Sequence, residues 1–436
     1  MDSEEAAEMF QPARGTRDFL PEEMMRRNWV LDRFREAFEA YGYEPLGTPA
    51  FESWEMLSVK SGEDILNQIY YFRDKSNREL GLRFEWTASL CRVVSSHREL
   101  PRPFKRYAIG PVWRYERPSE SRFREFWQAD VDVVGVADPI ADAEVIAVAV
   151  DCLRRVGFEG FLIRLNDRRI LEAAVEQAGL PPERSLDVFR AVDKLSKIGE
   201  EGVKEELGRI GATKEESEDI LKITDLRGEP GATLEKTREI MKSLPVGLSG
   251  CDALSAIAGY AAAFGIEAYM VVDLSLARGL DYYTGPVYEI YAEGFEDHGS
   301  IAGGGRYDEL IELFGGEATP ATGISLGVER IVPLLEKKEA FKGLDLGPSV
   351  YVAAASDSVR AKAIEVAQML RRSGVAADLD LMGRSLTRQL DYANRKGFKR
   401  AVIVGERELR EGCVAVRNME TAEQRTVRLE ELTAHL

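Results

Sequence analysis

The sequence is poor in the residues that build covalent or metal-held frameworks. It has four cysteines and three histidines in 436 residues, and the cysteines are far apart, with no Cys-x-x-Cys pair. Disulfide-rich folds and zinc sites both need closely spaced ligands of these two types. The composition therefore predicts neither a disulfide framework nor a structural zinc, and no metal-binding residues are assigned.

Long hydrophobic runs are also missing. Hydrophobic residues make up 44% of the chain, but they occur in short stretches that charged residues interrupt. Membrane-spanning helices need about 20 apolar residues in a row. The acidic N-terminus lacks the basic and then apolar pattern of a signal peptide. We therefore expect no membrane partner and a cytoplasmic location.

Positive charge is scarce over most of the chain. The formal net charge of -17 argues at first sight against a partner rich in phosphate. Residues 347–436, however, contain 15 Lys and Arg against 12 Asp and Glu, so this segment carries +3 and the rest -20. The segment includes the basic run Arg395-Lys396-Gly397-Phe398-Lys399-Arg400. Such a run is more often a solvated face than a binding site, so it proves nothing alone.

The length and the residue patterns predict more than one domain. A chain of 436 residues exceeds what one core usually organises. Met24–Tyr41 has apolar residues at helical spacing and stops at Gly42, which predicts a long amphipathic helix. A charged helical pattern from Asn166 to about Lys242 suggests an insertion, and Lys337–Pro348 suggests a linker.

Strands and helices alternate after this linker, which is typical of an α/β domain. The apolar runs predict strands, and the amphipathic stretches between them predict helices. The expected elements are strands at Val350–Ala354, Ala376–Leu379 and Ala401–Val404, and helices at Ser358–Arg372 and Leu386–Arg395.

Polar and charged residues gather in Arg106–Gly135, which predicts two strands joined by a loop at Pro118–Ser121. Because side chains alternate along a strand, Arg114 and Glu116 should share one face of the first strand. Four residues should share a face of the second: Phe126, Gln128, Asp130 and Asp132. A solvated hairpin face would explain this pattern. The four arginines near the loop favour phosphate binding instead: Arg114, Arg117, Arg122 and Arg124.

This hairpin resembles motif 2 of the class II aminoacyl-tRNA synthetases, which has an Arg-x-Glu arm, a variable loop and a returning Phe. The segment Gly47–Glu52, with Pro49, resembles motif 1, which builds a dimer interface in that family. Gly323–Arg330 resembles motif 3, a strand that runs into a helix with an ATP-binding arginine near its start. Outside this context, Arg330 would be read as a surface arginine.

The stretch Leu276–Gly285, with the sequence LARGLDYYTG, is similar to the histidine-specific signature of the histidyl-tRNA synthetases. Ile301–Asp308 resembles the glycine-rich turn of the same family, although three glycines alone would also suit a flexible hairpin. Ala13–Phe19 resembles the family's opening, and Gly383–Leu386 resembles part of its anticodon-binding domain. The resemblance covers almost the whole chain.

The resemblance implies an α/β (α+β) fold. A class II catalytic domain with an antiparallel sheet would comprise residues 1–166 and 246–336. Residues 167–245 would form a helical insertion, and residues 347–436 an α/β anticodon-binding domain. The implied partners are L-histidine, histidine tRNA and a second copy of the chain in a homodimer.

The family's site residues carry over to matching positions of this sequence. Arg278 and Arg114 would act at the transferring phosphoryl group. The implied ATP-binding residues are Arg114, Glu116, Arg122, Phe126 and Arg330. The implied histidine-binding residues are Glu85, Thr87 and Gln128 at the α-amino group, Asp132 and Tyr283 at the imidazole, and Tyr282 beside them. The residues expected to contact tRNA are Arg384, Arg395, Lys396, Lys399 and Arg400.

The implied reaction forms histidyl-adenylate from histidine and ATP, with Mg²⁺ carried largely by the phosphates, and then transfers histidine to the tRNA. Four positions depart from the commoner family pattern without removing a charged catalytic group: Trp86, Trp127, Asp132 and Pro286. Asp132 is one methylene shorter than the glutamate common in the family, so the imidazole pocket needs a compensating shift.

Two alternatives remain open. One is a regulatory relative of the synthetase that senses histidine, but such proteins typically lose the signature arginine and the anticodon domain, and both are present here. The other is a class II synthetase for glycine, proline or threonine, against which the LARGLDYYTG stretch speaks. The chain has no class I HIGH or KMSKS signature and no GxxxxGK[ST] loop, so a P-loop ATPase has no support.

Overall fold

The computed structural model describes residues 10–59, 62–119, 122–277, 282–344, 346–347 and 349–436. The chain divides into two compact units, Met1–Ala340 and Phe341–Leu436. Each unit has its own sheet and its own hydrophobic core. The larger unit contains both cavities described below.

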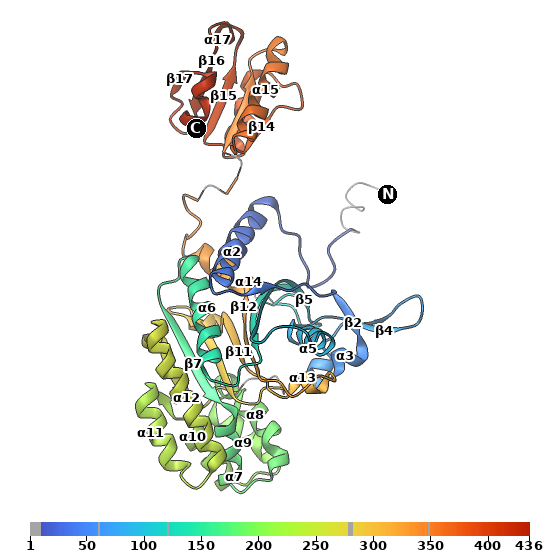
Figure 1. Ribbon diagram of the computed structural model, residues 1–436, viewed down its shortest axis with the longest axis vertical. Coiled ribbons are helices and arrows are strands. Elements are labelled where there is room, and N and C mark those ends of the chain that lie inside the picture. Colours follow the sequence, from blue (N-terminus) through green and yellow to red (C-terminus); the bar gives the residue numbers. More distant parts are fainter. Residues whose placement is uncertain (1–9, 60–61, 120–121, 278–281, 345, 348) are drawn as a thin grey trace. The chain divides into compact units, whose positions relative to one another are not determined.

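A nine-stranded sheet forms the centre of the larger unit, in the order β1-β5-β6-β12-β11-β10-β7-β9-β8 (Figure 1). Neighbouring strands are antiparallel except for the pairs β1–β5 and β7–β9. The predicted antiparallel-sheet fold is therefore confirmed. In sheet order the strands are Glu44–Pro45, Phe104–Trp113, Glu125–Val134, Ala321–Gly327, Ala302–Arg306, Pro286–Ala292, Phe161–Asp167, Met270–Asp273 and Arg227–Gly228.

Three helices pack together beside this sheet. The predicted N-terminal helix is present as α2, Pro21–Ala40, and its buried side chains include Phe34 and Phe38. It contacts α6, Ile140–Arg155, and α14, Val328–Lys337, and α6 in turn contacts β12. Their apolar faces cover the sheet next to the polar residues of β6.

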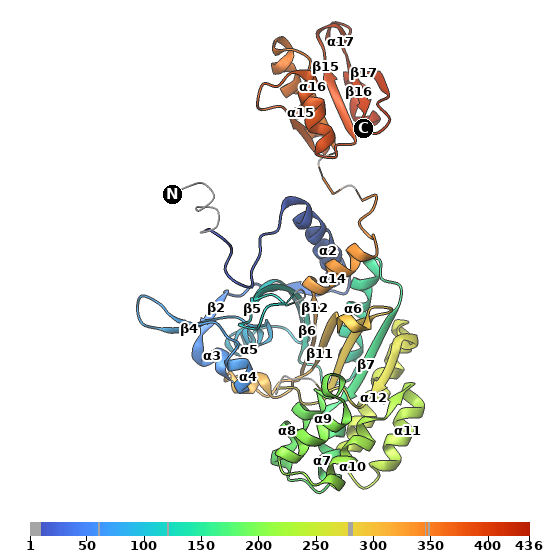
Figure 2. The same ribbon diagram turned by 180° about the vertical axis from the view of Figure 1, so that it is seen from behind.

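A small three-stranded sheet, β2-β4-β3, precedes the first long strand of the larger sheet. Its strands are Phe51–Ser53, Glu79–Leu82 and Tyr71–Arg73. The hairpin of β3 and β4 projects from the body of this unit (Figure 2). The helices α3, Trp54–Ser58, α4, Glu63–Leu66, and α5, Thr87–Ser96, adjoin it. Phe51 and Tyr71 remain exposed on this sheet.

The segment between β7 and β9 is mainly helical. Its helices are α7 Arg168–Gln177, α8 Ser185–Val192, α9 Leu195–Arg209, α10 Lys214–Thr224, α11 Pro230–Ile240 and α12 Pro245–Phe264. Among the described residues, α12 alone is long and apolar enough to cross a membrane, with a mean hydropathy of 1.2. It packs against α6, α7, α11 and β7.

The smaller unit has a five-stranded sheet in the order β14-β13-β15-β16-β17. The predicted strands are present as β13 Val350–Ala354, β14 Ala377–Leu379 and β15 Arg400–Val404, and the predicted helices as α15 Arg360–Arg372 and α16 Leu386–Arg395. Two antiparallel strands that we did not predict complete the sheet: β16 Cys413–Asn418 and β17 Gln424–Arg428. A short helix, α17 Glu406–Arg410, lies between β15 and β16.

The predicted polar hairpin is present, but its first strand is shorter than expected. β5 pairs with β6 from Phe104 to Trp113, and one further backbone hydrogen bond, from Arg114 to Arg124 at 2.9 Å, lies beyond the strand. Tyr115 ends the pairing because its backbone N–H donates to the carbonyl oxygen of Gln68 at 2.7 Å instead of to β6. The strand is therefore shorter than predicted, although Arg114 and Glu116 line the same cavity, which is described below.

Candidate active site

A cavity of about 270 Å³ opens beside the β5–β6 hairpin and the start of α14. All five residues expected to bind ATP line it: Arg114, Glu116, Arg122, Phe126 and Arg330. Arg330 donates to the carbonyl oxygen of Ser300 at 2.6 Å, and Arg114 donates to that of Phe84 at 3.1 Å. Backbone contacts on both sides of the cavity thus hold the two guanidinium groups that are expected to meet phosphates.

Glu329 is a lining residue of this cavity that sequence reasoning missed. It forms a buried ion pair with Arg27 of α2 and accepts a hydrogen bond from the backbone N–H of Trp127 at 3.2 Å. It therefore ties α2, β6 and α14 together next to Arg330. Its position directly before Arg330 in motif 3 was the available signal.

Of the two unusual tryptophans, only Trp127 lines the larger cavity, and Trp86 packs against one of its lining residues. Trp86 packs with Phe126 in one buried cluster, and the Arg83 guanidinium lies 3.7 Å from the centre of its ring. Trp127 lines the larger cavity, and Arg27 lies 5.4 Å from its ring centre. Neither tryptophan lines the smaller cavity described next, where we expected a compensating shift near Asp132.

A second cavity of about 50 Å³ adjoins the first. The two cavities share four lining residues: Arg114, Gln128, Gly303 and Ser325. All six residues expected to bind histidine line the smaller cavity: Glu85, Thr87, Gln128, Asp132, Tyr282 and Tyr283. The fold thus brings these residues together from β6, the start of α5 and the segment before β10.

Buried carboxyl groups dominate the smaller cavity. Burial raises the pKa of Glu85 to about 7, opposed mainly by the nearby Arg114. Burial also raises the pKa of Asp130 to about 7, opposed mainly by Arg106. Tyr282 donates a hydrogen bond to Glu85 at 3.0 Å. Near neutral pH these two carboxyl groups are therefore poised to lose a proton when a cation binds.

Asp132 is held on both carboxylate oxygens. Arg106 of β5, which is 1% exposed, forms an ion pair with it at 2.6 Å, and Tyr307 donates its hydroxyl proton to the other oxygen. An imidazole contact would use the remaining lone pairs of these oxygens. Arg106 and Tyr307 were not among the expected site residues, although both lie in segments that sequence analysis had singled out.

The glycine-rich segment Ile301–Asp308 contains a central strand of the sheet, β11, and is not a flexible hairpin. A Cβ atom on Gly304 would lie 1.9 Å from the carbonyl oxygen of Gly323 on β12. On Gly323 it would lie 2.1 Å from the Asp132 carboxylate. These glycines let β11 and β12 approach each other and leave room for Asp132.

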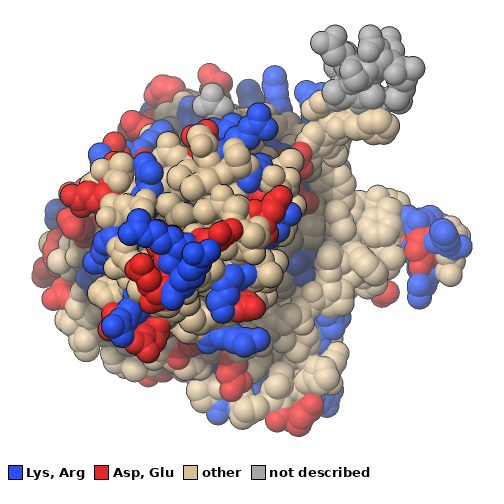
Figure 3. All heavy atoms as spheres, turned by 90° about the horizontal axis from the view of Figure 1, so that it is seen from above, with Lys and Arg blue, Asp and Glu red and all other residues tan. Residues whose placement is uncertain are grey.

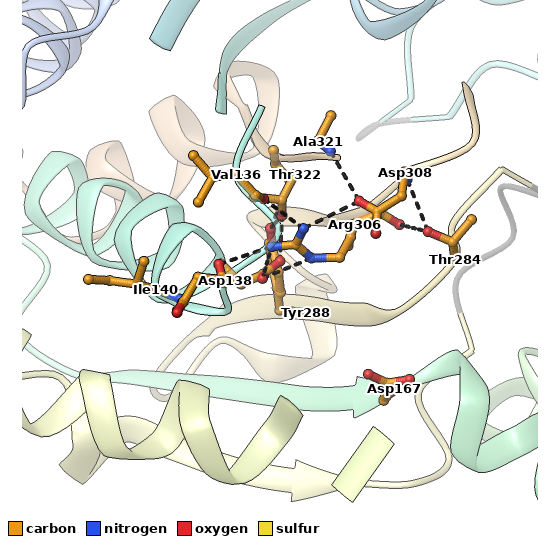
Figure 4. A network of polar contacts seen from close by, with 12 residues as sticks. Val136, Asp138, Ile140, Asp167, Thr284, Tyr288, Arg306, Asp308, Ala321 and Thr322 are labelled. Atoms are coloured by element: carbon orange, nitrogen blue, oxygen red, sulfur yellow. Dashed lines mark hydrogen bonds and ion pairs between the residues drawn. The ribbon is translucent and has the colours of Figure 1, made fainter. Parts of the chain in front are cut away.

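Arg306, at the end of β11, anchors a second buried network (Figure 4). Its guanidinium donates to the carboxylates of Asp142 and Asp308 and to the backbone carbonyl oxygens of Val136 and Asp138. Because Tyr307 follows Arg306 directly, this network fixes the backbone from which Tyr307 reaches Asp132.

Arg278 lies outside the described residues, so its predicted position at the α-phosphate stays a prediction. The chain on either side is held firmly. Asn166 donates to the carbonyl oxygens of Leu274 and Leu276 at 3.2 and 2.9 Å, and Arg168 donates to that of Tyr283 at 2.9 Å.

The residues expected to contact tRNA lie in the smaller unit. Arg395, Lys396 and Lys399 are exposed, whereas Arg384 and Arg400 are half-buried. Arg384 lies 4.6 Å from the ring centre of Tyr392. Figure 3 shows positive and negative side chains interleaved on the face turned to the viewer, so the positive charge does not form one continuous patch there.

Comparison with known proteins identifies the family. A family model described as Histidyl-tRNA synthetase matches residues 15–331, more than half of the chain. The chain belongs to the histidyl-tRNA synthetase family. A model described as Anticodon binding domain matches residues 349–436. The predicted enzyme class, an aminoacyl-tRNA synthetase for histidine, is thereby confirmed.

Proteins named histidine–tRNA ligase or histidyl-tRNA synthetase match this chain over nearly their full length. The histidine–tRNA ligase of Pyrococcus furiosus is 39% identical over 425 residues, which cover 97% of this chain and 98% of that protein. That of Methanocaldococcus jannaschii is 39% identical, with 98% and 99% covered. The crystal structure of histidyl-tRNA synthetase from Nostoc sp. PCC 7120 matches with a TM-score of 0.85 at 31% identity, covering 98% of this chain and 99% of that chain.

The histidyl-tRNA synthetase fold also occurs in a protein with a second name. A structure from Bacillus halodurans C, named as an ATP phosphoribosyltransferase regulatory subunit/histidyl-tRNA synthetase, matches with a TM-score of 0.76 at 25% identity. It covers 88% of this chain and 96% of that chain. The anticodon-binding domain match favours the enzyme over the regulatory alternative.

Proposed function

We propose that this chain activates L-histidine with ATP in the two adjoining cavities and then transfers histidine to the 3′ end of histidine tRNA. One observation carries the proposal. The residues expected for ATP line one cavity, those expected for histidine line the other, and Arg114 and Gln128 belong to both. Two substrates bound in this way would meet next to Arg114, where their reacting groups must come together.

The chemistry needs no nucleophile from the protein. The histidine carboxylate attacks the α-phosphorus of ATP, and pyrophosphate leaves. Arg114, and Arg278 by the family resemblance, would stabilise the charge that develops on the transferring phosphoryl group. Phe126 would stack on adenine, and Arg330, Arg122 and Glu116 would hold the nucleotide. The ribose hydroxyl of the tRNA then attacks the adenylate carbonyl, and AMP leaves.

The lining of the larger cavity fits a magnesium ion that the substrate carries. Its carboxylates are Glu116 and Glu329, which form ion pairs with Arg122 and Arg27. Among the described residues, no group of three His, Cys, Asp or Glu side chains could hold a metal. Mg²⁺ bound mainly to phosphate oxygens would neutralise their charge during the transfer, with Glu116 as the protein group within reach.

The buried polar groups of the histidine pocket would recognise the substrate. Glu85, Thr87 and Gln128 would receive the α-ammonium group, and Asp132 and Tyr283 the two imidazole nitrogens, with Tyr282 holding Glu85. An analogue that lacks a ring nitrogen would leave a buried group unpaired, which costs about 1–3 kcal/mol. This discrimination would make a separate editing reaction unnecessary.

We assign the remaining parts of the chain by the same resemblance. The catalytic domain would be residues 1–166 and 246–336, the helical insertion residues 167–245, and the anticodon-binding domain residues 347–436. Arg384, Arg395, Lys396, Lys399 and Arg400 would contact the tRNA. The enzyme would act in the cytoplasm as a homodimer.

The decisive experiment is amino-acid-dependent exchange of labelled pyrophosphate into ATP, with each amino acid tested in turn. We expect exchange with histidine alone. Exchange with another amino acid, or equal exchange without any, would contradict the proposed specificity. Charging of histidine tRNA by the same preparation tests the second step.

A further inference from the structure

Two buried acceptor atoms lie in the wall of the smaller cavity, and the scheme above gives no role to the second of them. They are Oε1 of Gln128 and Oδ1 of Asp130, and neither has a hydrogen-bond partner within the part of the chain that the structure describes. A buried polar atom without a partner costs about 1–3 kcal/mol, so a pair of them needs a reason. Asp130 is 5% exposed and lines the cavity.

One hydroxyl from the neighbouring strand connects the two side chains. Nε2 of Gln128 donates to Oγ of Ser325 at 2.9 Å. Burial raises the pKa of the Asp130 carboxyl group, and the Arg106 charge and a hydrogen bond with the same Ser325 side chain oppose this rise. Ser325 is the direct partner of Asp130 in the β6–β12 register, and Gln128 lies two residues earlier on the same face of β6.

Asp130 fixes the direction of this chain of hydrogen bonds. An ionised carboxylate can only accept, so the single hydroxyl proton of Ser325 must point to Asp130. Oγ of Ser325 is then left as an acceptor, and the Gln128 amide must turn its N–H₂ group toward it. The amide oxygen therefore faces away from Ser325. Without the carboxylate, the amide could turn over and present N–H₂ to a bound ligand.

The charged side chains around the smaller cavity favour a cationic ligand. The carboxyl groups of Glu85, Asp130 and Asp132 face the guanidinium groups of Arg106 and Arg114, as their mutual electrostatic effects show. Among the described residues of this site, the three ionised carboxyl groups carry one negative charge more than the two guanidinium groups balance. An ammonium group would balance this charge and supply protons for the two unpartnered acceptors.

We propose that Asp130 and Ser325 orient the Gln128 amide so that its oxygen accepts from the α-ammonium group of histidine, and that Asp130 is a further acceptor for that group beside Glu85 and Thr87. This inference rests on the proposed function, because it takes histidine as the ligand of the smaller cavity. Ser325 is a positioning residue that acts through Gln128, whereas Asp130 both positions the amide and meets the ammonium.

Calorimetric titration of the full-length protein at pH 8 with two ligands tests this. The ligands are L-histidine and its deamino analogue, 3-(imidazol-4-yl)propionate, which differ only in the α-ammonium group. In Ser325→Ala and in Asp130→Asn, the affinity for histidine should fall about tenfold or more, the equivalent of one hydrogen bond to a charged group. The affinity for the deamino analogue should change less than about twofold. Ser325→Thr keeps the hydroxyl and should restore histidine binding.

The controls separate this inference from the proposed function and from folding. Ser217→Ala removes a buried hydroxyl that bonds to the Thr213 carbonyl far from both cavities, and it should alter neither affinity. Equal losses for both ligands in a folded variant, or unchanged histidine affinity in both variants, would overturn the assignment. If the unaltered protein does not bind histidine, this result contradicts the proposed function itself, whatever the variants do. If Asp130→Asn does not fold, the Ser325 variants decide.

Discussion

Single residues of the smaller cavity are arranged for a ligand at a cost to the stability of the empty protein. Glu85 and Asp130 are buried, and burial raises the pKa of each to about 7. Ionised carboxyl groups in such surroundings lose hydration that the protein does not fully replace. A carboxyl group at these positions therefore favours substrate binding but lowers the stability of the ligand-free protein.

Glu85→Gln should stabilise the ligand-free protein at pH 8 and much less at pH 5. In the folded protein the pKa of Glu85 is raised from its ordinary value of 4.5 to about 7. The folded state therefore holds a proton that the unfolded state has lost between these values, and stability falls as the pH rises through this window. Glutamine cannot ionise and avoids that loss. Thermal unfolding at both pH values should show a gain of about 2 °C or more at pH 8.

The same variant should need more histidine for half-maximal pyrophosphate exchange, while its ATP requirement stays close to normal. Glutamine still accepts from Tyr282 but no longer offers a charge to an ammonium group. A larger gain in melting temperature at pH 5 than at pH 8 would show that burial does not control the ionisation of Glu85.

At the scale of the elements, the site depends on the close approach of β11 and β12. Gly304→Ala should therefore unfold or severely destabilise the catalytic unit, because the added methyl group would lie 1.9 Å from the carbonyl oxygen of Gly323. Neighbouring backbone in a central strand cannot move aside cheaply, so we expect a loss of at least about 3 kcal/mol in denaturant titration. A variant with normal stability would contradict the observed β11–β12 packing.

Gly259→Ala is the matched control. Gly259 lies on an exposed part of α12, and an added Cβ would have nothing within 4 Å. Alanine in a helix interior is favoured over glycine by about 0.5–1 kcal/mol. This variant should be slightly more stable than the parent chain, with unchanged pyrophosphate exchange.

At the scale of the whole molecule, the two compact units divide the chain at Ala340. Deleting the chain from about Gly347 should leave histidine-dependent pyrophosphate exchange largely intact and severely reduce charging of full-length tRNA, because both cavities lie in the larger unit. Exchange and charging are measured on the same preparation. Normal charging by the truncated chain would contradict the anticodon-binding role of the smaller unit.

A milder change in the full chain serves as the control for the truncation. Neutralising Arg395, Lys396, Lys399 and Arg400 should weaken tRNA binding and flatten its dependence on salt, with each lost phosphate contact lowering the slope by up to about 0.9. Pyrophosphate exchange should not change, since these residues lie outside the larger unit.

The assembly should be a dimer of twice the 48.7 kDa chain mass in light scattering. The resemblance places motif 1 at the interface, and two features in and beside this segment support the assignment. β1 is an edge strand of the nine-stranded sheet, and Phe51 is 53% exposed beside the ring of Phe72. Exposed aromatic side chains next to a sheet edge are typical of a surface that a partner covers. A fully active monomer would contradict the prediction.

The sequence by itself determined the family, the main elements and most of the chemistry. Motifs such as LARGLDYYTG are local strings, so they can be recognised without knowledge of the fold. Helices and strands with regular apolar spacing, such as α2 and β13, were predicted because their periodicity follows from local geometry. The short strands β16 and β17 were not predicted, since their pairing depends on neighbours across the sheet.

Only the tertiary structure decided how the residues meet. Arg106, Tyr307, Glu329 and Ser325 gain their places from strands and helices that are far apart in the chain, and no spacing in the sequence encodes those contacts. It also showed that Arg114 lies beyond its strand, since a backbone hydrogen bond from Tyr115 to Gln68 ends the pairing. Hydrogen bonds between distant segments depend on the packed fold. Local sequence patterns could therefore predict the substrates, but not the residues that hold the substrate-binding side chains in position.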